Sequence, residues 1–234
     1  MRHFRKRPLE VFQCALERWI VLIMPLIIRR SLRTGLGGVY VRGCWESFPY
    51  AAVIALNHHS WWDGYLLWLI RLKISRHVGG LMDPDQLGRF RFFRKLGMID
   101  ARKVRKVLKR LQKGQSMFIF PEGELRKPGR VKHVFKGATY LSSKARVPLV
   151  PIACRVVLRG GERPEAFLNI GIPRDLENHN GTELIDDLNL LLDEVDSAIG
   201  VADPQEIPEG FVTWIRGRRP ANERNAWVER FWRF

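Results

Sequence analysis

The sequence predicts an α/β fold: a single domain with a central, mostly parallel β-sheet flanked by helices, plus an N-terminal membrane-interface helix. Two observations lead to this fold class. Short β-type runs alternate with helical patterns through the middle of the chain. With 234 residues, 46% of them apolar, the chain is long enough to bury one core, which excludes wholesale disorder.

The expected strands are short runs rich in β-branched, aromatic and other apolar residues, at 39–42, 51–56, 77–82, 117–120, 149–154 and 167–172. The expected helices carry apolar residues at helical spacing, at 63–73, 84–96, 103–113, 138–144 and 182–199. Gly114 is placed to end the third of these helices. Helices between strands predict crossover connections and therefore parallel pairing.

The first 36 residues are expected to form an amphipathic segment that lies on the membrane. The uninterrupted apolar run covers residues 19–28, whereas a spanning helix needs roughly 20 residues. Pro25 would kink a helix that runs through it. Arginines follow the run where a signal peptide would have small residues for cleavage, and they suit anionic headgroups instead. A helix that docks on the protein's own core is the alternative.

Residues 211–234 are expected to form a basic, aromatic tail behind an α/β domain at 37–210. Trp214, Trp227 and Trp232 are interleaved with arginines. Tryptophan beside arginine is typical of the bilayer boundary. Base stacking on single-stranded nucleic acid, or packing of the tail on the core, would use the same residues. A membrane is favoured because both ends of the chain share this character.

The net charge of +16 is unevenly distributed. Residues 1–160 hold 32 Lys and Arg against 9 Asp and Glu, whereas residues 174–210 hold 11 acidic residues against Arg174 alone. A basic field attracts polyanions: nucleic acid, an anionic membrane surface or phosphorylated substrates. The acidic residues are expected on the solvated face of the helix at 182–199. Three scattered cysteines without a Cys-x-x-Cys pair argue against a disulfide scaffold or zinc knuckle and are typical of a reducing cytosol.

Residues 57–63, Asn-His-His-Ser-Trp-Trp-Asp, follow an expected strand and open a helix. The turn after a strand's carboxyl end is where α/β sheets place ligands. With His58 in the turn and Asp63 in the first helical turn, the carboxylate reaches the imidazole and fixes it for general-base work. Ser60 and Asp63 also form a capping box, which needs no catalysis. His58, His59 and Asp63 as metal ligands are the other alternative, without a further ligand cluster to support it.

A second expected strand runs into Pro121, Glu122 and Gly123, with Arg126 close behind. Main-chain N–H groups at such a turn, beside an arginine, suit a phosphate or a hydroxyl-bearing group. Proline and glycine also make ordinary turns. The chain has no Gly-x-Ser-x-Gly elbow and no glycine-rich phosphate loop, which argues against a nucleophile-elbow hydrolase and against P-loop or dinucleotide-binding folds.

Together these motifs, about 60 residues apart, resemble the glycerolipid acyltransferase family, whose type member is the lysophosphatidic acid acyltransferase. His58 and Asp63 match the family's first motif, Asn-His-x-Ser with a following Asp. Residues 120–123 match its third, Phe-Pro-Glu-Gly-Thr-Arg. A Val-Pro-x-x-Pro strand is echoed at 147–151, and a Gly-x-x-x-x-x-Arg segment is met loosely at 97–102.

The resemblance implies transfer of a fatty acyl group from an acyl thioester (acyl-CoA or acyl-carrier protein) to a lipid alcohol. Lysophosphatidic acid or a related lysophospholipid is the default acceptor. His58 would deprotonate the acceptor hydroxyl and Asp63 would orient the imidazole, with no metal, cofactor or covalent acyl-enzyme. The residues expected to bind substrate are Glu122, Gly123, Arg126, Arg102 and Lys103.

The chain departs from the family's third motif, since Glu124, Leu125 and Arg126 stand where Thr and Arg are expected. A carboxylate beside a phosphate is repulsive by on the order of 1 kcal/mol or more. A non-phosphate lipid alcohol, such as a glycolipid or an amino-acid lipid, is therefore an alternative acceptor.

The expected location is the cytoplasmic face of a membrane, the bacterial inner membrane, with peripheral or monotopic attachment to its anionic surface and no nucleic-acid partner. Two other functions stay open on the sequence alone. One is a basic membrane- or nucleic-acid-binding module without catalysis. The other is a thioester hydrolase in which His58 activates water.

Overall fold

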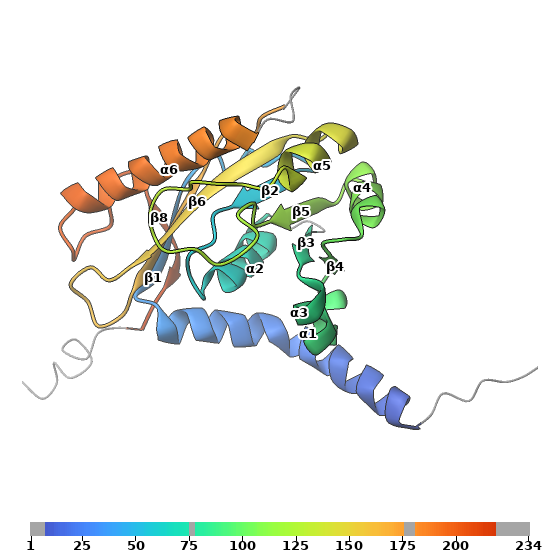
Figure 1. Ribbon diagram of the computed structural model, residues 1–234. Helices are drawn as coiled ribbons and strands as arrows, with labels where there is room; N and C mark the ends of the chain where they lie inside the picture. Colours follow the sequence, from blue (N-terminus) through green and yellow to red (C-terminus); the bar gives the residue numbers. More distant parts are fainter. Residues whose placement is uncertain (1–7, 75–77, 176–180, 219–234) are drawn as a thin grey trace, which may run out of the picture.

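The structure is a computed structural model, which describes residues 8–74, 78–175 and 181–218. Eight strands form one sheet in the order β4-β3-β5-β2-β6-β7-β1-β8 (Figure 1). The strands are β1 (Gly38–Gly43), β2 (Val53–Leu56), β3 (Val78–Met82), β4 (Met98–Asp100), β5 (Ser116–Ile119), β6 (Leu149–Val157), β7 (Glu165–Ile170) and β8 (Val212–Arg216). The helices are α1 (Pro8–Gly35), α2 (Asp63–Lys73), α3 (Pro84–Arg89), the 3₁₀ turn η1 (Arg91–Arg94), α4 (Val104–Gln112), α5 (Gly137–Ala145) and α6 (Gly181–Val201).

The sheet is mixed but mostly parallel, which confirms the predicted fold class. Strands β4, β3, β5, β2 and β6 all run in one direction. Strand β7 is antiparallel to β6, β1 is parallel to β7, and β8 is antiparallel to β1. The carboxyl ends of the five parallel strands therefore share one edge of the sheet, and the turns that follow β2 and β5 emerge there side by side.

Helices cover both faces of the sheet (Figure 1). On one face α1 and α2 bury Leu32 and Leu66 against β2, β6 and β7. On the other face α4, α5 and α6 bury Val107, Leu141 and Leu188. Because both faces are covered, the central strand β2 is buried along its whole length.

The prediction of one continuous helix at 84–96 is wrong. Asp83 caps α3, since its Oδ1 accepts hydrogen bonds from the N–H groups of Asp85 and Gln86. Phe90 then leaves the helical conformation, with φ −115° and ψ 67°, so that only the short turn η1 follows. Strand β4, which the sequence prediction missed, comes next and pairs with β3.

The described part of the predicted tail completes the sheet. Residues 212–216 form the edge strand β8, in which Ile215 is buried and Trp214 packs against the core. Trp227 and Trp232 lie outside the described residues, as does His77 at the start of the strand expected over 77–82.

The last turns of helix α1 dock on the protein's own core, which is the alternative expectation for the N-terminal segment. The helix continues through Pro25 and ends at Gly35. Ile28 and Leu32 are buried in the core. By contrast, an apolar group on the preceding turns is exposed: Trp19, Leu22, Ile23, Leu26 and Ile27. Within the described residues, no helix is sufficiently long and apolar to cross a membrane.

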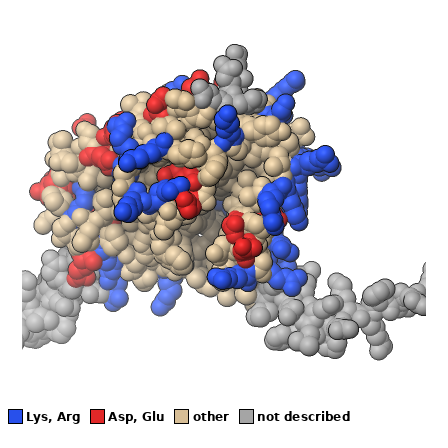
Figure 2. Space-filling view, viewed as in Figure 1, with Lys and Arg blue, Asp and Glu red and all other residues tan. Residues whose placement is uncertain are grey.

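The acidic helix α6 is only partly solvated, because several of its carboxylates pair with arginines from other elements. The pairs are Arg42–Glu194, Arg130–Asp193, Arg155–Asp196 and Arg174–Asp187, at 2.6–2.9 Å. These contacts fix α6 over the sheet. Lys and Arg side chains, blue in Figure 2, occur across the face shown. One group of them lies on the side where α4 lies.

Candidate active site

His58 lies in the turn after β2, and Asp63 is the first residue of α2. The His58 Nδ1 atom is 2.8 Å from Asp63 Oδ2. The Asp63 side chain is fully buried, whereas 24% of the His58 side chain is exposed. A carboxylate at Nδ1 holds the proton on that nitrogen and leaves Nε2 to accept one from a substrate. The predicted His58–Asp63 pairing is therefore present.

The same carboxylate holds the turn. Asp63 Oδ2 also accepts hydrogen bonds from the N–H groups of His59, at 2.8 Å, and Ser60, at 2.9 Å. The bond from Ser60 is the backbone half of the capping box that the sequence suggested. The capping and catalytic interpretations are therefore compatible, since one oxygen serves both.

Two side chains anchor this turn to β6. The Asn57 side chain donates to the Cys154 carbonyl at 3.1 Å and accepts from the Cys154 N–H at 2.7 Å. The Val156 N–H donates to His59 Nε2 at 3.2 Å. Burial lowers the pKa of His59, which favours the neutral ring that accepts this bond. His59 is thus committed to structure, and His58 is the histidine left for chemistry.

Glu122 connects the second motif to the first. It is 6% exposed, and its Oε1 accepts a hydrogen bond from the His58 N–H at 2.8 Å. The Arg126 N–H donates to the His58 carbonyl at 2.7 Å. Burial raises the pKa of Glu122 above its ordinary value. The motif after β5 therefore holds both peptide groups of His58.

Phe120 and Gly123 shape the surroundings of the imidazole. The Phe120 ring stacks on the His58 ring, with 4.0 Å between centroids and 16° between planes. Gly123 has φ +76°, and a Cβ there would lie 2.6 Å from the ring of Phe135. Gly123 is therefore required for the turn itself, because a side chain would be both strained and crowded.

The Arg126 guanidinium lies 2.7 Å from the Glu124 carboxylate, and both side chains are largely exposed. This pair is built from the residues by which the chain departs from the family motif. It neutralises the arginine that the resemblance assigns to substrate binding.

Arg102 and Lys103 are not brought next to His58. They follow β4, which is three strands from β2 in the sheet, a separation of roughly 14 Å at the usual strand spacing. Arg102 is exposed and pairs with Asp100 at 3.2 Å. The two residues therefore lie at the same carboxyl edge of the sheet as His58 but three strands away from it.

Besides the bond from His58 to Glu122, two contacts of the site escaped the sequence analysis. One is the stacking of Phe120 on His58. The other is Cys154, whose buried thiol lies 3.7 Å from Asp63 Oδ1, and burial raises its pKa well above the ordinary value. The protonated thiol is a weak donor to the carboxylate. Within the described ranges, no group of three or more His, Cys, Asp or Glu side chains is placed to hold a metal.

A family model described as Acyltransferase matches residues 46–155. The match includes both turns and the His58–Asp63 pair. This segment, 110 of the 234 residues, matches the acyltransferase family. The resemblance expected from the two motifs is confirmed, and the chain is an enzyme of acyl transfer.

The fold of this acyltransferase is similar to a solved structure, the 1-acyl-sn-glycerophosphate (LPA) acyltransferase PlsC from Thermotoga maritima. The TM-score is 0.58 at 20% sequence identity, and the match covers 83% of this chain and 85% of that chain. A search of curated proteins found no match.

Proposed function

We propose that this acyltransferase moves a fatty acyl group from an acyl thioester, acyl-CoA or acyl-carrier protein, to the hydroxyl of a lipid alcohol. The observation that carries the proposal is the hydrogen bond of 2.8 Å between His58 and the buried carboxylate of Asp63, at the carboxyl edge of the sheet. A histidine oriented in this way is suited to take a proton from a hydroxyl group.

His58 Nε2 accepts the acceptor's hydroxyl proton while the alkoxide oxygen attacks the thioester carbonyl. The imidazolium is stabilised by Asp63 until the proton passes to the departing thiolate. The oxygen–carbonyl bond forms, the carbon–sulfur bond breaks, and the proton lost by the alcohol leaves with the thiol. No acyl group is carried by the enzyme.

The class of acceptor is inferred from the family likeness and from the loop after β5, whose Glu122 and Arg126 hold His58. The similarity to an LPA acyltransferase makes a lysophospholipid the default acceptor. The Glu124–Arg126 pair opposes this choice, because a guanidinium already paired with a carboxylate has less attraction for a phosphate. We therefore place a lipid alcohol without a phosphate beside the lysophospholipid as a second acceptor class.

We further propose that the exposed apolar face of α1 rests on an anionic membrane surface at the cytoplasmic side. Trp19, Leu22 and Leu26 are each 65–69% exposed, and Arg29 and Arg30 follow on exposed positions. Apolar side chains flanked by arginines suit the boundary between acyl chains and headgroups.

A vesicle-sedimentation experiment tests the membrane proposal. Leu22→Glu with Leu26→Glu is expected to reduce binding to vesicles that contain anionic lipid. Leu190→Glu with Val201→Glu is the control, because these side chains are also exposed and lie on α6. Equal loss in both double variants would overturn the proposal.

Product analysis tests the reaction. The wild-type protein is incubated with an acyl thioester and a panel of lipid alcohols that includes lysophosphatidic acid and a glycolipid, and the products are identified by mass spectrometry. We expect an ester that forms only with acceptor and is lost in His58→Ala. Release of free fatty acid at the same rate with and without acceptor would instead identify a hydrolase.

A further inference from the structure

A cavity of about 230 Å³ lies at the edge of the sheet opposite His58. Val78 begins β3, and Gly97 and Gln115 directly precede β4 and β5, so these lining residues place the cavity at the amino ends of three parallel strands. The catalytic turns follow the carboxyl ends of β2 and β5. The cavity therefore lies outside the candidate active site, and the inference drawn from it does not depend on the proposed function.

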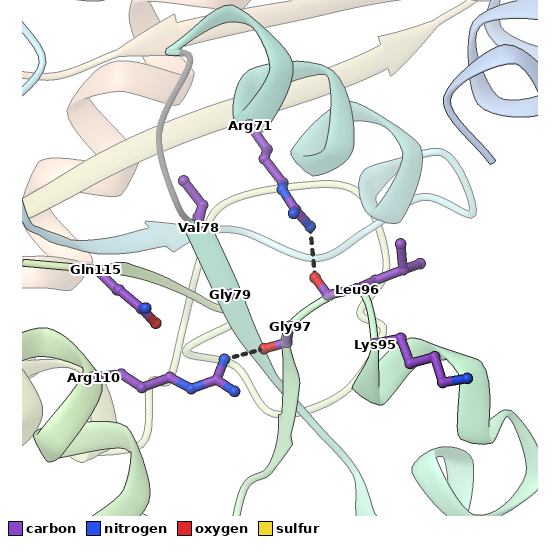
Figure 3. Close-up of a pocket in the computed structure, with 8 residues that line it drawn as sticks. All are labelled: Arg71, Val78, Gly79, Lys95, Leu96, Gly97, Arg110 and Gln115. Carbon is purple, nitrogen blue, oxygen red and sulfur yellow. Dashed lines mark hydrogen bonds between the residues drawn. The ribbon is translucent and has the colours of Figure 1, made fainter. Parts of the chain in front are cut away.

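Arg71, Arg110 and Lys95 line this cavity, and none of its described lining residues is acidic; in Figure 3 the Lys95 side chain points away from the two arginines. Arg71 comes from α2 and Arg110 from α4, so the two guanidinium groups approach from helices on opposite faces of the sheet (Figure 3). The third cationic residue, Lys95, directly precedes Leu96, which also lines the cavity. Like charges that converge in this way repel one another unless an anion lies between them.

Each arginine donates to one backbone carbonyl, and the Arg71 guanidinium also lies 4.9 Å from the centroid of the Trp68 ring. Arg71 Nη1 donates to the Leu96 carbonyl at 2.6 Å, and Arg110 Nη1 donates to the Gly97 carbonyl at 3.0 Å. These carbonyls belong to consecutive peptide units, so the two Nη1 atoms lie within roughly 10 Å of each other. A guanidinium has five N–H donors, which leaves several on each side chain beyond these bonds.

Neither Arg71 nor Arg110 has an ion-pair partner in the part of the chain that the structure describes. Both are half-buried. Burial lowers the pKa of Arg71, and no carboxylate contributes to offset this effect. An anion in the cavity would supply the missing compensation.

Glycine keeps the floor of the cavity open. A Cβ at Gly79 would lie 2.6 Å from the Gly97 carbonyl oxygen and 3.3 Å from Arg110 Nη1. Gly97 itself has φ +96°, a conformation that favours glycine. The position of Arg110 beside β3 thus depends on the absence of a side chain there.

We propose that this cavity binds a phosphate group between the guanidinium groups of Arg71 and Arg110. Phosphate accepts hydrogen bonds on all its oxygens and matches the planar fork of arginine. At about 230 Å³ the cavity has room for more than one phosphate ion, so free phosphate and the phosphate of a soluble nucleotide are the two sources that the test distinguishes.

The test measures binding of inorganic phosphate to the full chain by calorimetry at constant ionic strength. We expect Arg71→Gln and Arg110→Gln each to weaken binding by at least about tenfold, as removal of a charge-assisted bidentate contact does. Lys109→Gln is the matched control, since it makes the same charge change on the exposed neighbour of Arg110. We expect its Kd to stay within about twofold of wild type.

A second measurement needs no variant. Phosphate is expected to slow modification of Arg71 and Arg110 by phenylglyoxal in the wild-type protein, without slowing that of exposed Arg89.

Binding of adenosine 3′,5′-bisphosphate to the wild type and to the Arg71→Gln and Arg110→Gln variants distinguishes the two sources of phosphate. If the bisphosphate binds more tightly than phosphate with the same dependence on Arg71 and Arg110, the source is a nucleotide; if it does not, the source is free phosphate.

Two results would overturn the proposal. One is the lack of saturable phosphate binding to the wild type. The other is an equal loss of binding in Lys109→Gln, which would show that general surface charge, and not the cavity, attracts the anion.

Discussion

Glu122 accepts a hydrogen bond at 2.8 Å from the backbone N–H of His58, which lies 64 residues earlier in the chain. This single bond joins the turn after β2 to the turn after β5. Since Asp63 holds the imidazole ring and Glu122 holds the peptide group that carries it, the position of His58 is fixed at two points. In the proposed reaction Glu122 would therefore act through His58, as a positioning residue.

Replacement of Glu122 separates hydrogen bonding from charge. Glu122→Ala leaves the half-buried N–H of His58 without its acceptor, which costs about 1 kcal/mol of stability. It is also expected to lower kcat by about 10- to 100-fold, because the imidazole shifts. Glu122→Gln keeps an acceptor oxygen and is expected to retain most of the activity. Steady-state kinetics and urea unfolding of both variants check this; equal activity in the two would contradict it.

Burial raises the pKa of Glu122 in the folded protein, so the folded state holds this proton more tightly than the unfolded state does. Stability of the wild type relative to Glu122→Gln should therefore fall as pH rises from about 4.3, the ordinary value for Glu, through the raised pKa, and level off above it. Urea unfolding of both proteins across this pH range measures the difference. A difference that stays constant, or that grows in favour of the wild type, would refute the assignment.

Asp63→Asn should abolish most of the activity. The amide no longer selects the tautomer with the proton on His58 Nδ1, and the expected loss in kcat is roughly 10³- to 10⁴-fold. Asp203→Asn is the control, because Asp203 also accepts a backbone N–H, from Gln205, but does not contact His58. Initial rates with one acyl thioester and one acceptor are compared, with melting temperatures recorded for both variants.

Glu124→Thr should increase the use of lysophosphatidic acid. The substitution releases the Arg126 guanidinium from its ion pair of 2.7 Å. An exposed pair of this kind is worth up to about 1 kcal/mol, so kcat/KM for a phosphate-bearing acceptor should rise about 3- to 5-fold. Glu209→Thr, which removes another exposed carboxylate, should leave kcat/KM unchanged. A rise for uncharged acceptors as well would show that the effect is not electrostatic.

The sequence predicted the His58–Asp63 pairing because it depends on local order, a strand, a turn and a helix start within a few residues. The bond from His58 to Glu122 was not predictable in the same way. It depends on β2 and β5 being neighbours in the sheet, although β3 and β4 lie between them in the chain. Strand order is a property of tertiary packing, which the local pattern does not encode.

The two strands that the sequence prediction missed, β4 and β8, show only a weak hydrophobic pattern. Strand β4 has three residues, too few to show a period, and β8 was interpreted as part of a tail because tryptophan and arginine dominate its surroundings. Helix α2, by contrast, begins and ends where its pattern predicts, at Asp63 and Lys73. Its apolar side faces the sheet throughout, which makes the helical period plain.

The rate of ester formation by His58→Ala tests the central claim most directly. His133→Ala is measured beside it, since His133 is an exposed histidine that is not placed in the site. At saturating thioester and acceptor, loss of the general base should lower kcat by at least about 10²-fold, with the melting temperature of the variant near that of wild type, and His133→Ala should retain its activity. A folded His58→Ala protein that forms ester as fast as His133→Ala would contradict the account.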